Sequence, residues 1–226
     1  MTDNNTNFQA GHRQRLRQKF LDGNLAEYEL LELLLSFVIP RRDVRILARG
    51  MIQKFGGLHH IFTAPVDELV KYPGIGQNCA VFLKAVQQAM LCAYKSNLTE
   101  SPIFHDNATL TNYCRMLLAG KTVEEFHVLY LDKEMRLIKD EQHSVGSVAQ
   151  SAVYPREIVK QALALNARNI VLLHNHPTPQ TSFSDADVKV TQLLKNILEP
   201  IDIKLHDHYV ISDGILYSAR AMFLIS

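Results

Sequence analysis

The spacing of the apolar residues changes near residue 97, and this change restricts the chain to a fold with two different parts. Before it, apolar side chains recur at intervals of three and four, which is typical of short amphipathic helices that share a core. The clearest series are Tyr28, Leu31, Leu35 and Val38, followed by Val44, Leu47, Met51 and Phe55. At 226 residues with 47% apolar content, the chain can bury a core in each of two small domains. We predict an all-helical domain over residues 1–98.

The second part mixes strand patterns with helix patterns. A polar stretch at 96–107, "SNLTESPIFHDN", precedes it and has the composition of a linker. The predicted strands are 125–132, "RLIKDEQ", 169–173, "IKLHDHYVI" and "ILYSA", with turns at "DKEM" and at Asp213–Gly214. The predicted helices are 155–166 and 184–198. We therefore expect an α+β protein whose mixed-sheet domain covers residues 104–226.

Charge and cysteine content argue against several classes of protein. The net charge is +1, with a small excess of basic residues in the first hundred positions, which is only a weak indication of nucleic-acid binding. The three cysteines form no Cys-x-x-Cys pair, so a disulfide framework or a thiolate metal site is not expected. No signal peptide is recognisable, and the longest apolar run is interrupted by Glu32 and ends at Pro40. We expect a soluble, cytoplasmic protein that does not enter membranes.

Two histidines, His174 and His176, directly follow the apolar run 169–173. Alternate residues of an extended segment point to the same side, so both imidazoles are placed to reach one metal ion. Asp187 follows Ser184, a good helix N-cap, by three residues and falls in the first helical turn, where the helix dipole favours a carboxylate. Two imidazole nitrogens, one carboxylate and a water molecule are the ligand set of a catalytic zinc ion, which lowers the pKa of that water.

Each half of this pattern also has a purely structural interpretation. Most His-x-His pairs bind no metal, and Ser-x-x-Asp at the start of a helix is a capping box in its own right. The metal hypothesis is favoured because the two halves follow one another as strand, loop and helix in a single frame.

The whole string resembles the His-x-His-x7-Ser-x2-Asp motif, called JAMM, of the JAB/MPN metalloproteases, and its spacing matches at every position. The resemblance implies a cytidine-deaminase-like JAB/MPN fold in which His174, His176 and Asp187 bind zinc. It also implies that Ser184 stabilises the oxyanion of a tetrahedral intermediate.

The same resemblance implies a glutamate upstream that acts as general acid and base. It aligns this residue with Glu124, two positions before Phe126, and the neighbouring Glu125 stays open as the alternative. Asp207 and His208 resemble an Asp-His pair of the family and are expected near the site, either orienting a ligand or serving the fold.

Longer segments resemble the RadC proteins, the bacterial branch of this superfamily. The resemblance extends from Gly11 to about Met222 and is carried by "GHRQRLRQKF", "EYELLELLLSFVIPRRDVRILA", "YPGIGQNCAVFLKAV", "VYPREIVKQALALNARNIVLLHNHP" and "LHDHYVIS". Two departures are the loop "TPQTSF" after the histidines and Ser212 in place of a usual glycine. The family name is loosely associated with DNA repair.

The segment "PGIG" resembles a helix-hairpin-helix. Its glycines permit a tight turn that exposes backbone N–H groups at the start of the next helix, and such groups attract a phosphate. Gly74, Ile75 and Gly76 are then the candidate donors for sequence-independent DNA binding, although a purely structural corner explains the segment equally well. The nearest candidate basic patch consists of Arg41, Arg42, Arg45 and Arg49.

Three functions follow from these patterns. The favoured one is a zinc-dependent hydrolase that cleaves a peptide or isopeptide bond. The alternatives are a DNA-binding accessory protein of repair or recombination with a non-proteolytic metal domain, and a metal-dependent nuclease. A deaminase is disfavoured because the sequence contains no His-x-Glu and no Pro-Cys-x-x-Cys. The pattern specifies neither the substrate nor the oligomeric state.

Overall fold

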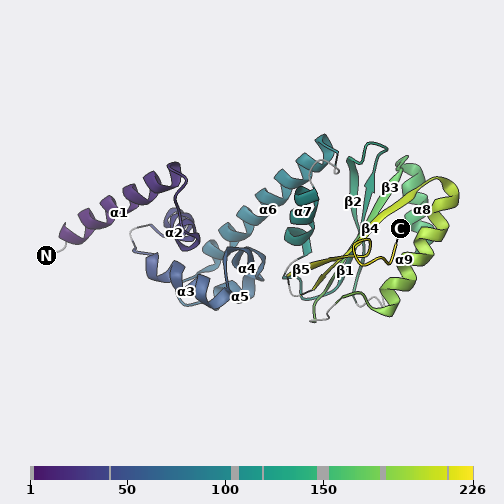
Figure 1. Cartoon of the computed structure of the whole chain (residues 1–226). Helices are drawn as coiled ribbons and strands as arrows, with labels where there is room; N and C mark the ends of the chain where they lie inside the picture. The colour runs from purple at the N-terminus through teal and green to yellow at the C-terminus, as the bar shows by residue number, and fades with distance from the viewer. Residues whose placement is uncertain are drawn as a thin grey trace. The chain divides into compact units, whose positions relative to one another are not determined.

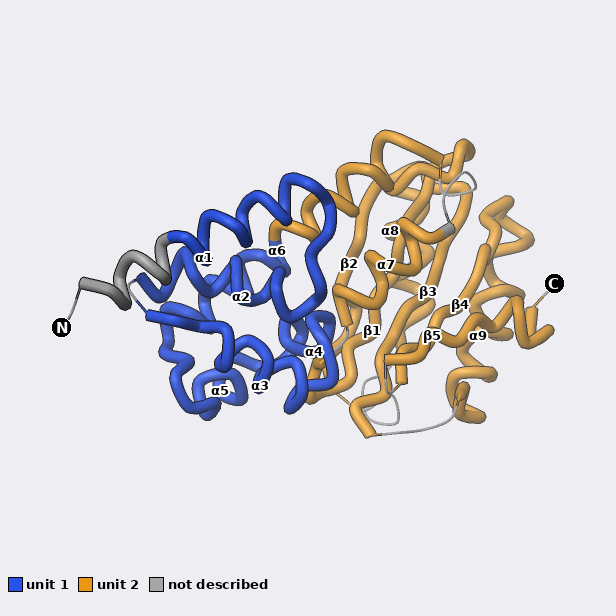
Figure 2. Tube along the Cα trace, turned by 60° about the vertical axis from the view of Figure 1, so that its left-hand side comes forward, with its two compact units in different colours: residues 1–88 blue, residues 89–226 orange. Residues whose placement is uncertain are grey.

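The chain divides into two compact units in a computed structural model, residues 1–88 and 89–226 (Figure 2). The structure describes residues 3–40, 42–102, 107–118, 120–146, 153–178, 182–212 and 214–225, without the side chains of 3–10 and 107. The boundary between the units falls inside α6 (Gln77–Glu100), ahead of the predicted linker. It lies there because Leu91, Tyr94 and Leu98, in the second half of α6, pack on the core of unit 2.

Unit 1 is all-helical. Its helices are α1 (Asp3–Leu21), α2 (Glu27–Val38), α3 (Arg45–Phe55), α4 (Leu58–Thr63), α5 (Val66–Val70) and the first half of α6. Apolar side chains from α2 to α6 form one core, and α3 ends where Gly56 takes a left-handed conformation at φ +86°. The apolar residues that recur at intervals of three and four are therefore those on the inward faces of short helices.

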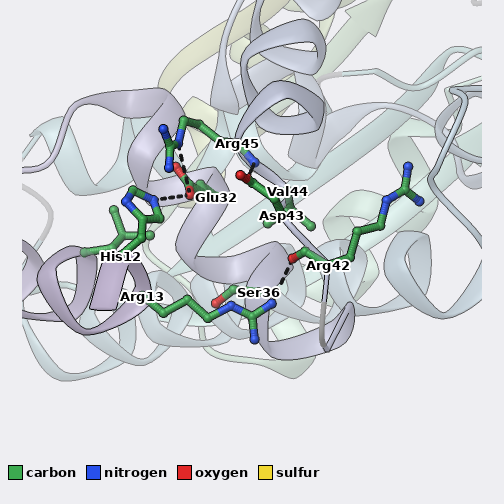
Figure 3. Close-up of a pocket in the computed structure, with 9 residues that line it drawn as sticks. His12, Arg13, Glu32, Ser36, Arg42, Asp43, Val44 and Arg45 are labelled. Atoms are coloured by element: carbon green, nitrogen blue, oxygen red, sulfur yellow. Dashed lines mark hydrogen bonds and ion pairs between the residues drawn. The ribbon is translucent and has the colours of Figure 1, made fainter. Parts of the chain in front are cut away.

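A buried carboxylate on α2 connects α1 with the first residue of α3 (Figure 3). Glu32 is 3% exposed and lies 2.7 Å from Nε2 of His12 and 3.9 Å from Nε of Arg45. Arg13 donates to the carbonyl of Arg42 at 2.9 Å. The cavity among these side chains is about 20 Å³, which is room for one water molecule, so this cluster serves the packing of the helices.

Unit 2 contains a five-stranded mixed sheet with helices on both faces (Figure 1). Its elements are α7 (Asn107–Leu118), β1 (Glu125–Leu131), β2 (Leu137–Val145), α8 (Pro155–Ala164), β3 (Asn169–His176), α9 (Asp185–Leu198), η2 (Glu199–Ile201), β4 (Lys204–Ser212) and β5 (Ile215–Ser218). The strand order is β2-β1-β3-β4-β5, and only β3 and β4 are parallel. The α+β prediction is confirmed. Among the described helices, none has the length and apolar character needed to cross a bilayer.

The two faces of the sheet have separate cores. Phe126, Val128 and Tyr130 of β1 pack in the core under α8 and α9, while Leu129 and Leu131 pack in the core under α7. The same alternation in β3 puts its even-numbered side chains on the α9 face and its odd-numbered ones on the α7 face. The α9 face therefore receives both histidines of the motif.

The parallel pairing of β3 with β4 contains a register shift that decides which β4 side chains face α9. Ile170 pairs with Leu205 and Val171 pairs with Asp207, so one residue of β4 is passed over. Leu205 packs in the α8 and α9 core, and His208, beyond the shift, pairs with Leu172 of that same core. The shift thus places Leu205 and His208, which are three positions apart, on the same α9 face of the sheet.

Candidate metal centre

Two imidazoles meet at the end of β3. His174 is fully buried and His176 is 9% exposed. Their Nε2 atoms lie 3.0 Å apart. The backbone of His174 pairs with both β1 and β4, and that of His176 pairs with Ser212 of β4, so neighbouring strands fix the backbone that carries both rings.

The first turn of α9 brings a carboxylate to these nitrogens. Asp187 is 1% exposed, with Oδ1 3.2 Å from Nε2 of His174 and Oδ2 3.3 Å from Nε2 of His176. Ser184 is the N-cap residue, and its backbone N–H and hydroxyl both donate to Oδ2 of Asp187 at 2.7 Å. The Ser-x-x-Asp segment is thus a capping box and, with the same carboxylate, part of the candidate centre.

The carboxylate stays ionised in this setting. Burial raises the pKa of Asp187, but contacts with His174 and His176 and the Ser184 hydroxyl outweigh it and hold the pKa well below its usual range. Lone pairs of two ring nitrogens and a carboxylate therefore converge on one point. Such an arrangement is stable only when a proton or a metal cation lies between the atoms.

Of the two candidate glutamates, Glu124 belongs to this group. Ligand atoms of Glu124, His174 and His176 all lie within 4.8 Å of one another, which makes the three a possible metal-binding group. Glu125 has its carboxylate 2.9 Å from Nζ of Lys121 and 3.5 Å from Nε2 of His127. Glu125 is the first residue of β1 and Glu124 immediately precedes the strand, and their carboxylates have different neighbours.

Asn175, between the two histidines, holds the chain on both sides of Glu124. Its side-chain oxygen accepts from the backbone N–H of Glu125 at 2.9 Å, and its side-chain N–H donates to the carbonyl of Val123 at 3.1 Å. The sequence analysis did not single out this residue. Period-two alternation places it opposite the histidines, but its partners depend on how β1 pairs with β3.

The Asn175 amide should make a measurable contribution to stability. An Asn175→Ala variant leaves the N–H of Glu125 without a partner at a residue that is only 8% exposed. We expect a loss of about 1–3 kcal/mol in the free energy of unfolding. Chemical denaturation followed by circular dichroism measures it. The control is Asn196→Ala on the exposed side of α9, and equal effects of both substitutions would argue against the Asn175 contacts.

Other predicted positions lie around the centre or outside the described residues. His208 is fully buried beside His174, whereas Asp207 accepts from the Ser218 hydroxyl at 2.6 Å and so connects β4 with β5. In the loop "TPQTSF", residues 179–181 are outside the described residues, as is Asp213 of the predicted turn. Ser212 is 1% exposed and pairs with Ile215.

Comparison with known proteins agrees with this architecture. The family described as RadC-like JAB domain matches residues 104–223, which include β1 to β5 and the candidate centre. A UPF0758 protein of Ruegeria pomeroyi is 37% identical over 213 residues, covering 93% of this chain and 95% of the relative. The resemblance drawn from the motifs is confirmed, and the chain belongs to the RadC family of proteins with a JAB domain.

Proposed function

We propose that this protein is a zinc-dependent hydrolase that cleaves a peptide or isopeptide bond. The observation that carries the proposal is the convergence of two imidazole nitrogens and one carboxylate, with a glutamate beside them. The ligands are His174, His176 and Asp187. Glu124 is the general acid and base, and Ser184 stabilises the oxyanion.

The spacing between the nitrogen and oxygen atoms of the three proposed ligands supports zinc. Zinc bonds of ~2.0–2.1 Å in tetrahedral geometry place neighbouring ligand atoms about 3.3 Å apart. The two Nε2 atoms are 3.0 Å apart, and they lie 3.2 and 3.3 Å from the Oδ1 and Oδ2 atoms of Asp187, respectively. Three protein ligands also leave one coordination position for water, as in catalytic zinc sites.

A bound zinc ion would supply Lewis acidity and a water molecule of lowered pKa at this point. Glu124 then takes the proton that the attacking water loses and returns it to the leaving nitrogen. The Ser184 hydroxyl donates a hydrogen bond to the oxygen that becomes negative in the tetrahedral intermediate. In the structure this hydroxyl donates a hydrogen bond to Oδ2 of Asp187, and the Ser184 backbone N–H donates to the same oxygen. The hydroxyl can therefore rotate toward the substrate while Oδ2 keeps the hydrogen bond from the backbone.

The test is metal stoichiometry combined with a substrate panel. Full-length protein, stripped with a chelator and reloaded with zinc, should bind one ion per chain and cleave a member of a panel of peptides and isopeptide-linked conjugates. Cleavage of DNA instead of peptides by the loaded protein supports the nuclease alternative. Zinc below stoichiometry after reloading overturns the proposed site.

Sequence-independent DNA binding by unit 1 is a second candidate function. Gly74 has φ +95°, and a Cβ at this position would lie 3.7 Å from both terminal nitrogens of Arg42. A Cβ atom added at Gly76 would contact nothing within 4 Å, so the turn is open at this residue. Ile75 is 4% exposed and anchors the turn in the core. An exposed guanidinium therefore lies beside the turn that opens the 24-residue helix α6, which supports phosphate binding.

The other arginines of the predicted patch have different surroundings. Arg45 lies 3.9 Å from Glu32, and Arg49 stacks on Tyr28 with its guanidinium carbon 4.5 Å from the ring centre. Arg41 lies outside the described residues. Figure 3 shows the Arg42 side chain pointing away from the Glu32 cluster. Arg42 is thus the best-placed cation of the set for a phosphate.

Removing Arg42 should weaken DNA binding by the full-length protein in a salt-dependent way. If its guanidinium meets a phosphate, Arg42→Ala lowers affinity for every duplex sequence alike and reduces the slope of log affinity against log salt by about 1. Fluorescence anisotropy over a salt series measures both. Arg49→Ala is the charge-matched control and should leave the slope unchanged. No binding by the wild type at low salt, or equal losses in both variants, would contradict a phosphate site at this turn.

A further inference from the structure

A third histidine joins the candidate centre from β4. His208 is fully buried, and its Nε2 atom lies 2.9 Å from Nδ1 of His174. Its other ring nitrogen, Nδ1, lies 2.7 Å from the hydroxyl of Thr191 on α9. That hydroxyl also lies 2.5 Å from the backbone carbonyl oxygen of Asp187. Three hydrogen bonds therefore connect the ring of one proposed ligand with the main chain of another.

The direction of these hydrogen bonds follows from counting protons. A carbonyl oxygen has no proton to give, so Thr191 donates its only hydroxyl proton to Asp187. With that proton used, the Thr191 oxygen can only accept from His208, and Nδ1 of His208 must carry a hydrogen. The assignment needs no assumption about a metal ion.

The surroundings of His208 keep its ring neutral. The ring lies edge-on to Phe126 and Phe183, with centroids 5.9 and 5.2 Å away, and its nitrogens face a hydroxyl and an imidazole. Because the ring is fully buried and none of these neighbours carries a negative charge, the charged form would lose its hydration without compensation, and the neutral ring is favoured. A neutral imidazole carries one hydrogen, so with Nδ1 protonated its Nε2 is an acceptor.

The same reasoning extends to His174. Because Nε2 of His208 accepts, Nδ1 of His174 must donate to it across 2.9 Å. The atom of His174 that faces His176 and Asp187 is Nε2. With the Nδ1 proton held by His208, Nε2 is the nitrogen whose lone pair is available to a metal ion.

We propose that His208 and Thr191 are positioning residues that keep His174 protonated at Nδ1 and so present its Nε2 atom to the metal ion. The proposal rests on the metal site proposed above. In the other tautomer of His174 a proton occupies the coordinating atom, and the ring has no donor for His208. Thr191 also fixes the carbonyl of Asp187, so two ligands on different elements, β3 and α9, are oriented by one set of hydrogen bonds.

The first experiment compares zinc affinities of full-length variants by competition with a chromogenic chelator. Thr191→Val keeps the shape of the side chain and removes the hydroxyl, and we expect zinc affinity to fall about 10–100-fold. Thr191→Ser keeps the hydroxyl and should bind within about twofold of wild type, since it restores the same donor and acceptor. His208→Leu should lose affinity as Thr191→Val does, whereas His208→Gln retains a carbonyl acceptor for His174 and should recover part of it.

The second experiment observes the tautomer directly and separates positioning from simple packing. Nitrogen NMR of metal-free wild-type protein labelled in histidine should show Nδ1 of His174 protonated, and this signal should change in Thr191→Val. An unprotonated Nδ1 in the wild type overturns the proposal, as does zinc affinity in Thr191→Val within twofold of wild type. Failure of the wild type to bind zinc would overturn the proposed function instead, and the NMR result would still decide the tautomer.

Discussion

Zinc binding should be lost when His176 is replaced by alanine, while unit 2 stays folded. Structural zinc sites with four protein ligands gain roughly 10–16 kcal/mol, so one ligand accounts for about 3 kcal/mol, or more than a hundredfold in affinity. His176 lies at the last position of β3, and its removal leaves the strands and the core under α8 and α9 in place. Metal content after dialysis against a chelator, measured by atomic emission, gives the result.

His60 on α4 provides the matched control for this substitution. It is exposed, belongs to unit 1 and is absent from the candidate centre, so His60→Ala should retain wild-type zinc content. Asp187→Asn adds a second test from a different element, because it preserves the shape of the side chain and removes the negative charge. Retention of one zinc ion per chain at wild-type affinity by His176→Ala would refute the assignment of the ligands.

Replacing Glu124 with glutamine should abolish turnover and leave zinc bound. Glutamine keeps the size of the side chain but cannot take up the proton of the attacking water, and general acid–base catalysis contributes about 10²–10⁴-fold. The three proposed ligands are untouched by the change. Initial rates on whichever substrate the panel yields, together with metal content of the same preparation, measure the two effects separately.

Glu125→Gln is the control for Glu124, since it changes the adjacent side chain by the same single atom. Its carboxylate lies near Lys121 and His127, apart from the metal-binding group, so turnover should stay within about threefold of wild type. The opposite outcome, normal turnover in Glu124→Gln and loss in Glu125→Gln, assigns the acid–base role to Glu125.

Local sequence patterns predicted the parts of the centre that lie on single elements. His174 and His176 share a face because a strand alternates, and Asp187 lies one turn into α9 because Ser184 begins the helix. The meeting of these two elements was implied only by resemblance to a known motif. Spacing along the chain contains no information on how a strand end and a helix start approach one another.

The residues that support the centre could not be predicted in the same way. Asn175 finds its partners across the β1–β3 ladder, and the contact of Thr191 with His208 joins α9 to β4. Each depends on strand register, which is a property of the assembled sheet. The division inside α6 was also missed, because the helical pattern continues unbroken while its apolar contacts pass from one core to the other.

The register shift in β4 makes the way in which that strand pairs with β3 a requirement of the metal centre. Without the shift, His206 would pair with Val171, and the next two side chains, Asp207 and His208, would exchange faces. A carboxylate would then replace a neutral imidazole behind His174, and Asp207 would lose its contacts to Ser218 of β5 and to Arg220 beyond that strand. The register of β4 is therefore under the same constraint as the histidine that it delivers.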